Sequence, residues 1–302
     1  FTWVFYQKLS REIISTRGNF QTLTYILKAS NKFEDLADIA IKWLQHPNCK
    51  DASRLEPLQV APLFLKKVNR TQSKQYISIL EELFDLQKTE IDIIYLKDLT
   101  DYYSDNYYKG GHLEDANKVI LYVTSLRQHN EYSKLLLSKE KEYLSVLLAA
   151  HLRVAQQFHN ELDFKAVSQH SRSVCSIISA LPNQTEVLKE PEFCFCLAAT
   201  YNFELQYKKS SSYLMMFKEA CASYRNKEEV DIFLTNPLLE FLAYDCYIDF
   251  LIRKDITNAI SILKWTQENI PAIKALVVQK KVFVKTSKRQ VPTENEEEKV
   301  RA

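Results

Sequence analysis

Apolar residues recur at intervals of three and four along most of the chain, the spacing that places side chains on one face of an α-helix. In residues 34–45, for example, this spacing puts Leu36, Ile39, Ala40 and Trp43 on one face. The same pattern covers residues 73–87, 89–108, 112–128, 131–158, 163–180, 190–208, 211–226, 237–252 and 255–269, and a shorter apolar segment runs from 271 to 278. Alternating apolar and polar runs, which indicate strands, do not reach a useful length. The pattern predicts an all-α protein of antiparallel helix pairs with short connections.

Prolines divide this helical pattern at two places. Pro47, Pro57 and Pro62 lie within residues 46–62 and predict a loop with a short helix after Glu56. A second loop-like gap, between 182 and 191, marks a possible boundary between two sub-modules. Residues 279–302 are first basic and then acidic, which is typical of a charged tail or linker. We therefore expect one helical-repeat domain over residues 1–278, followed by this tail.

Glycine is rare, and its scarcity limits the kinds of site that the chain can build. Only Gly18, Gly110 and Gly111 occur among 302 residues. Phosphate-binding loops, dinucleotide-binding loops and nucleophile elbows all need glycines where the backbone approaches a ligand. The adjacent pair is expected to end a helix near Lys109, because glycine readily takes the left-handed conformation that closes a helix.

The sequence around this turn resembles the tetratricopeptide repeat (TPR), a family of antiparallel helix pairs. The matching positions are Tyr107, Gly111, Leu113, Ala116, Ile120 and Val123, and a second match comprises Phe250, Ile256, Ala259, Leu263, Thr266 and Pro271, with Lys254 at the glycine position. Weaker matches lie at 26–47 and 158–174, whereas Thr100, Ser104 and Gln128 depart from the family pattern. The matches cover about half of the chain, and their intervals are not multiples of the 34-residue period of the family. The resemblance implies an irregular TPR-like α-solenoid in which the matching residues pack the helix pairs.

The reactive side chains form no recognisable catalytic or metal-binding motif. None of the six cysteines forms a C-x-x-C pair, and none of the six histidines forms H-E-x-x-H. The cysteines lie among apolar residues, which favours buried thiols in a reducing compartment, the cytoplasm or the nucleus. The acidic pair Glu81 and Glu82 is interpreted as part of a solvated helix face. We expect no cofactor, no metal and no enzymatic activity.

The overall charge and hydropathy limit the kinds of partner. A formal net charge of +2 gives little electrostatic attraction to nucleic acid, so we do not expect nucleic-acid binding as the main function. No apolar run is long enough to span a bilayer. The first residue is Phe1 rather than Met, so we expect the chain to be a segment of a longer protein.

Four tyrosines form the candidate partner-binding residues, Tyr102, Tyr103, Tyr107 and Tyr108. They cannot all face the interior of one helix, and tyrosine is favoured in protein interfaces. The alternative is that they bridge neighbouring layers of helices.

Stacked helix pairs present a concave surface that binds peptides or other protein subunits. We therefore expect a non-catalytic scaffold or adaptor in a eukaryotic multi-subunit complex. Two alternatives remain open at this stage. One is a regulatory helical region of a larger enzyme whose catalytic domain lies outside this segment, and the other is a nucleic-acid-binding helical repeat.

Overall fold

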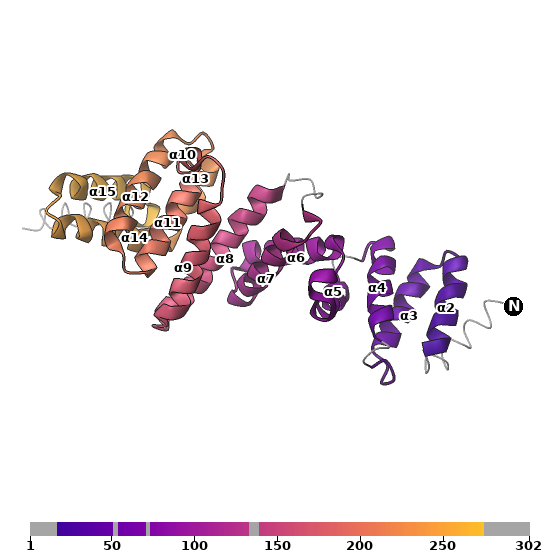
Figure 1. Cartoon of the computed structure of the whole chain (residues 1–302). Coiled ribbons are helices and arrows are strands. Elements are labelled where there is room, and N and C mark those ends of the chain that lie inside the picture. Colours follow the sequence, from indigo (N-terminus) through magenta and orange to yellow (C-terminus); the bar gives the residue numbers. More distant parts are fainter. Residues whose placement is uncertain (1–16, 51–53, 71–72, 133–138, 275–302) are drawn as a thin grey trace, which may run out of the picture. The chain divides into compact units, whose positions relative to one another are not determined.

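The computed structural model of the chain describes residues 17–50, 54–70, 73–132 and 139–274 (Figure 1). These residues form fourteen α-helices and one short 3-10 helix, and the described part contains no strand. The prediction of an all-α protein is therefore confirmed. The chain divides into two compact units, Phe1–Leu147 and Leu148–Ala302. The predicted boundary near 182–191 lies inside the second unit, and the predicted tail, 279–302, lies outside the described residues.

The described residues of the first unit before α8 form six helices, α2 (Arg17–Ala29), α3 (Phe33–Leu44), α4 (Leu55–Lys67), α5 (Lys74–Gln87), α6 (Ile93–Gly110) and α7 (Leu113–Gln128), with the 3-10 helix η2 (Lys88–Glu90) between α5 and α6. Helix α8 (Glu140–Asn160) contributes its first residues to this unit and the rest to the second. Helices that follow one another pack together, as α3 does with α4 and α6 with α7.

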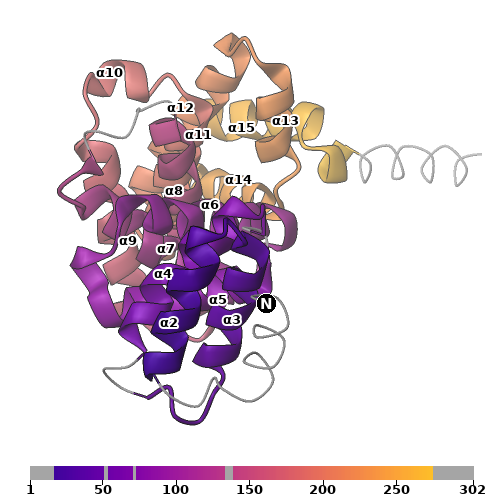
Figure 2. The same ribbon diagram turned by 90° about the vertical axis from the view of Figure 1, so that its right-hand side faces the viewer.

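The second unit continues with α9 (Phe164–Ser179), α10 (Gln184–Val187), α11 (Pro191–Phe203), α12 (Tyr207–Ser223), α13 (Lys227–Leu234), α14 (Pro237–Ile252) and α15 (Ile256–Asn269). Helix α11 is apolar on every side because it contacts α9, α12, α13 and α14 (Figure 2). The rings of Phe195, Phe217 and Phe233 meet at its centre, with centroids 5.5 to 6.2 Å apart. The core of this unit is thus built around α11.

One turn geometry recurs at five of the helix connections. In each, a single residue takes a left-handed conformation and is followed directly by the N-cap residue of the next helix. These left-handed residues are Asn31 (φ 54°), Gly111 (φ 61°), Leu162 (φ 62°), Leu205 (φ 60°) and Lys254 (φ 59°). The prediction that one of the paired glycines ends a helix is confirmed for Gly111, which closes α6. The other four positions achieve the same conformation without glycine.

Main-chain hydrogen bonds close the four turns that lack glycine. The N–H that follows the left-handed residue donates to a carbonyl five residues earlier: Lys32 to Leu27 at 3.0 Å, Asp163 to Phe158 at 2.9 Å, Gln206 to Tyr201 at 2.8 Å, and Asp255 to Phe250 at 2.9 Å. This is the hydrogen bond of the Schellman motif, which satisfies carbonyls at the end of a helix. The same local geometry therefore reverses the chain after α2, α8, α11 and α14.

A buried residue follows each of these turns at a fixed position. Four residues after the N-cap, the second helix of each pair carries Leu36, Ala116, Val167, Ser210 or Ala259, each no more than 3% exposed. Ser210 fits this apolar environment because its hydroxyl donates to the Ala198 carbonyl at 2.8 Å. Each recurring helix pair thus begins its packing at the same distance from the turn.

The remaining residues of the predicted repeat pattern divide between interior and surface. Phe250 is buried, whereas Leu113 and Ile120 are half-buried. Leu263 is 39% exposed and Pro271 is also exposed, and the interior positions of that segment are taken by Ile262 and Ile270. One residue corresponds to about 100° around a helix, so a pattern match that is one position out of register falls on a different face of the helix.

The prediction of a loop with a short helix after Glu56 holds for the non-helical residues 46–50, but it is wrong about the extent of the helix. Helix α4 runs for 13 residues from Leu55 through Pro62 to Lys67. Pro57 lies in the first turn, where a missing N–H costs no intrahelical hydrogen bond, but Pro62 removes one such bond. The buried side chains of α4, which include Leu58 and Leu65, offset this cost. Burial therefore outweighs the local preference of proline.

Candidate functional site

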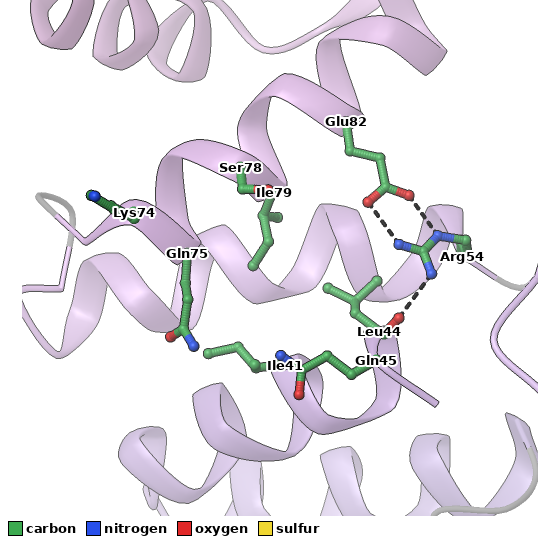
Figure 3. Close-up of a pocket in the computed structure, with 9 residues that line it drawn as sticks. All are labelled: Ile41, Leu44, Gln45, Arg54, Lys74, Gln75, Ser78, Ile79 and Glu82. Atoms are coloured by element: carbon green, nitrogen blue, oxygen red, sulfur yellow. Dashed lines mark hydrogen bonds and ion pairs between the residues drawn. The ribbon is translucent and has the colours of Figure 1, made fainter. Parts of the chain in front are cut away.

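A pocket of about 290 Å³ lies between α3 and α5 in the first unit (Figure 3). Its apolar lining consists of Ile41, Leu44 and Ile79. Its polar lining consists of Gln45, Lys74, Gln75 and Ser78, and Arg54 and Glu82 form one end. We call this set of nine residues the α3/α5 groove. Its volume suits one or two side chains of a bound peptide rather than a large cofactor.

The end of the groove is held by an ion pair. Arg54 Nε lies 2.5 Å from Glu82 Oε1, and Arg54 Nη2 donates to Glu82 Oε2 at 2.7 Å. Arg54 Nη1 also donates to the carbonyls of Leu44 at 2.8 Å and Cys49 at 3.2 Å. The hydrogen bond to Glu82 raises the pKa of Arg54 further above its usual value. This end of the groove is therefore fixed and electrically balanced.

The polar side chains along the rest of the groove have hydrogen-bonding capacity to offer. Gln45, Lys74, Gln75 and Ser78 form no hydrogen bond or ion pair through their side chains with the described residues. Figure 3 shows the side chain of Ile41 between the amide ends of Gln45 and Gln75. Amide side chains can donate to and accept from a peptide backbone, and the apolar lining can receive an aliphatic side chain. The groove thus places four polar side chains beside an apolar lining.

The four predicted partner-binding tyrosines lie on α6, but the structure does not give them one common surface. Tyr103 is half-buried, its ring stacks on Tyr122 of α7 with centroids 5.4 Å apart, and Tyr102 meets it edge-on at 5.2 Å. Tyr107 and Tyr108 lie one turn further along, with ring centroids 6.4 Å apart, and Tyr108 is 56% exposed. Tyr103 therefore belongs to the packing between helices, and Tyr108 offers the largest exposed ring.

Glu81 of α5 is a centre that joins three helices. Its Oε1 accepts hydrogen bonds from Tyr103 of α6 at 2.8 Å and from Tyr122 of α7 at 3.3 Å, and it pairs with Lys118 of α7 at 2.5 Å. The interpretation of Glu81 and Glu82 as a solvated pair is therefore wrong, because each binds residues of another segment.

Helix α6 carries two further carboxylate centres. Asp98 Oδ2 accepts from the Tyr76 hydroxyl of α5 at 2.5 Å and pairs with Lys66 of α4 at 3.0 Å. Asp101, three residues later, accepts from the Tyr143 hydroxyl of α8 at 2.6 Å. Lys97 and Lys139 also bind Asp101, at 2.5 and 3.3 Å. Contacts of carboxylates with tyrosines and lysines thus link α6 to α4, α5 and the start of α8, and link α5 to α7.

These contacts determine the protonation of the groups involved. Burial and the neighbouring carboxylates raise the pKa of the Tyr76, Tyr103, Tyr122 and Tyr143 phenols well above the ordinary value. Burial also pushes the pKa of Asp101 upward, but hydrogen bonds from Lys97 and Tyr143 and the charges of two lysines outweigh it and hold that pKa below its ordinary value. The phenols remain protonated and act as hydrogen-bond donors, which is a structural role.

The buried thiols, like the buried phenols, are held in their protonated form. Five of the six cysteines are buried, and Cys175 is half-buried. Burial raises the pKa of Cys194 and of Cys246 to about 11 and that of Cys221 to about 12. A protonated thiol is a poor nucleophile and a poor metal ligand. The described residues contain no cluster of three or more side chains suited to hold a metal ion.

A histidine pair connects α8 and α9 in the second unit. The Nδ1 atoms of His151 and His170 lie 3.0 Å apart, so one ring donates and the other accepts. His151 is only 6% exposed, and burial, together with the charge of His170, lowers the pKa of His151 to about 4. The pair is therefore neutral near pH 7 and serves as a buried hydrogen bond between two helices.

Sequence reasoning missed Arg54, the carboxylate centres and the histidine pair for one physical reason. In each, the side chains that join different elements are separated by 19 to 42 residues, so no local spacing reveals them. None of the helices in the described residues is long and apolar enough to cross a membrane. In comparisons with known proteins, no family model matches the chain, and no curated protein matches it significantly.

Proposed function

We propose that this chain is a non-catalytic helical-repeat scaffold that binds other protein subunits. The observation that carries the proposal is the recurring helix pair, with one left-handed turn residue, an N-cap, and a buried residue four positions later. Repetition of one local unit is the basis of TPR-like α-solenoids, whose function is to present binding surfaces. The left-handed residues at 31, 111, 162, 205 and 254 are unevenly spaced, which fits an irregular array.

The α3/α5 groove supports a peptide or a polypeptide segment as the bound partner. It combines an apolar lining with four polar side chains that have no partner among the described residues, and its rigid end is already neutralised by Arg54 and Glu82. Pockets of this kind bind through apolar contact and gain orientation from a few polar groups. The exposed ring of Tyr108 is a second surface of the proposed scaffold.

The non-catalytic part of the proposal is supported by the state of the reactive groups. The buried phenols and thiols have pKa values raised above their ordinary values, so they are held protonated at neutral pH. We place the protein in a reducing compartment, the cytoplasm or nucleus of a eukaryotic cell, on the basis of its five buried thiols.

Affinity purification with the immobilised chain tests the proposal when it is combined with a groove variant. Ser78→Tyr fills the groove, and Ser212→Tyr makes the same change at an exposed serine of α12. Proteins retained by the wild-type chain are identified by mass spectrometry, purified, and titrated against all three forms. We expect binding at least about tenfold weaker, or about 1.4 kcal/mol, for Ser78→Tyr only. Equal binding to all three forms contradicts the groove assignment, and retention of nucleic acid instead of protein contradicts the scaffold.

A further inference from the structure

Helix α14 carries apolar side chains on opposite faces. Its inner face, which packs on α12 and α11, carries Leu239, Leu242, Ala243, Cys246 and Phe250, all buried. Its outer face carries Phe241 at 66%, Tyr244 at 65%, Leu251 at 38% and Ile252 at 75% exposure. A helix with apolar side chains on opposite faces is normally covered on both. The outer face of α14 therefore lacks the cover that its composition demands.

Helix α15 extends this apolar surface. Ile256, Ile260 and Leu263 follow one another at intervals of four and three residues, and they are 53%, 48% and 39% exposed. Ala259 and Ile262 lie on another face of the helix and are buried. Because α14 and α15 pack as a pair joined by the tight turn at Lys254, their exposed stripes run along the same pair. We call these seven exposed residues the outer face of the α14/α15 pair.

The seven side chains of the outer face are uncharged, and three charged residues near them are bound within the unit, whereas Glu240 of α14 and Lys264 of α15 lie beside the face. Asp249 forms an ion pair with Arg253 one turn later, and the guanidinium of Arg253 lies over the Phe250 ring at 4.7 Å. Asp245 accepts a hydrogen bond from the Asn202 amide of α11 at 2.9 Å. The seven residues of the outer face consist of two aromatic and five aliphatic side chains. This face offers apolar contact without electrostatic selection.

We propose that the outer face of the α14/α15 pair binds the same face of a second copy of this chain, forming a two-fold symmetric dimer. In such an interface each side chain meets the surface that it came from, so a charged face would repel itself and an uncharged one does not. The seven side chains still expose on the order of 700 Å², and a stable interface needs about 800 Å² per partner. The polar rim of the two helices supplies the remainder.

The dimer goes beyond the proposed scaffold function, since it determines how many grooves one assembly presents. Two copies joined through α14 and α15 carry two α3/α5 grooves. A partner with two binding segments then gains avidity over a single contact. Failure of the dimer would leave the groove itself untouched, because the groove lies in the first unit and the outer face in the second.

Sedimentation equilibrium of the 302-residue chain tests the proposal directly. We expect concentration-dependent dimerisation, and Tyr244→Glu should weaken it at least about a hundredfold, because a two-fold interface places two new charges close together. Ile260→Lys on α15 should act in the same direction. The control is Tyr25→Glu on α2, which charges a residue that is 78% exposed in the first unit and should leave the dimer intact. Helicity by circular dichroism confirms that each variant is folded.

Three outcomes overturn the proposal. The first is a wild-type chain that stays monomeric up to about 100 µM, because a stable interface of this size dimerises at lower concentrations. The second is a dimer that persists unchanged in folded Tyr244→Glu and Ile260→Lys. The third is a monomeric full chain that dimerises only after residues 275–302 are removed, since those residues would then be the cover of the outer face.

Discussion

The guanidinium of Arg54 and the carboxylate of Glu82 face each other through two contacts, Nε to Oε1 at 2.5 Å and Nη2 to Oε2 at 2.7 Å. The same guanidinium holds the carbonyls at the end of α3 and in the connection that follows it. One arginine thus ties the end of α3, the start of α4 and the middle of α5 together. The two side chains are 28% and 38% exposed, so solvent weakens the Coulomb part of this interaction.

Removal of this arginine should destabilise the first unit measurably. We expect Arg54→Ala to lower the free energy of unfolding by about 2 kcal/mol, because it leaves Glu82 and two backbone carbonyls without their donor. Urea denaturation followed by circular dichroism measures the change. Lys189→Ala breaks an exposed pair with Glu186 and serves as the control, with an expected change below about 0.5 kcal/mol. Equal effects of the two substitutions would show that the Arg54 contacts are not structural.

The left-handed turns should favour glycine at each position, whether glycine is introduced or removed. Leu162 and Leu205 take φ values near +60° while being 72% and 50% exposed, so each bears conformational strain with little burial in return. We expect Leu162→Gly and Leu205→Gly to raise the free energy of unfolding by about 0.5 to 1 kcal/mol each. Gly111→Leu should lower it by about 1 kcal/mol, although a side chain there meets no atom within 4 Å.

Leu63 provides the matched control for these glycine substitutions. It is 52% exposed but lies inside α4, where glycine is unfavourable. Leu63→Gly should therefore destabilise the protein by about 1 kcal/mol. If glycine destabilised the turns as much as it destabilises α4, the turn conformation would not be left-handed in solution. Thermal and urea unfolding of the four variants distinguish the two cases.

The packing of α6 against α7 should depend on the size of residue 116. Ala116 has no exposed surface, so Ala116→Glu places a charge in the packed interior of the pair. We expect a loss of more than about 3 kcal/mol or failure to fold. Asn117→Glu introduces the same charge at the next, exposed position and should change stability by less than about 0.5 kcal/mol. A wild-type melting curve for Ala116→Glu would rule out this packing.

The histidine pair should make the second unit sensitive to mild acid. The pKa of His151 is lowered to about 4 in the folded protein, below its value of about 6.5 in an unfolded chain. Between these two values the unfolded state binds a proton that the folded state does not, so stability is complete above pH 6.5 and falls as the pH drops toward 4. His151→Gln should flatten the dependence of unfolding free energy on pH in this window. Proton NMR of the imidazole gives the folded-state pKa directly, and a value near 6.5 contradicts the buried pair.

Much of the fold follows from the sequence because helix periodicity is a local property. The 3.6-residue pattern correctly predicts helices in regions such as 113–128 and 237–252, and the glycine at 111 correctly predicts a left-handed helix end. Local reasoning fails at α4, because burial of its apolar face outweighs the prolines. It fails also for Leu162 and Leu205, because leucine carries no intrinsic preference for the conformation that it takes there.

The candidate site is less predictable from the sequence than the fold. Tyr103 and Tyr108 are chemically identical and five residues apart, yet one binds Glu81 and the other is largely exposed. What separates them is the position of α5 and α7 around α6, which depends on contacts between distant residues. The α3/α5 groove depends in the same way on Arg54, which lies on neither of the two helices that form its sides.

The main-chain closure of the hairpins has an evolutionary consequence. Since backbone N–H and carbonyl groups make the reversal at Asn31, Leu162, Leu205 and Lys254, almost any amino acid can occupy those positions at a modest energetic penalty. The amino acids at these four turns can therefore change during evolution while the helix pairs keep the same fold. Relatives of such a protein are better recognised by the positions of left-handed residues along the backbone than by conserved amino acids at the turns.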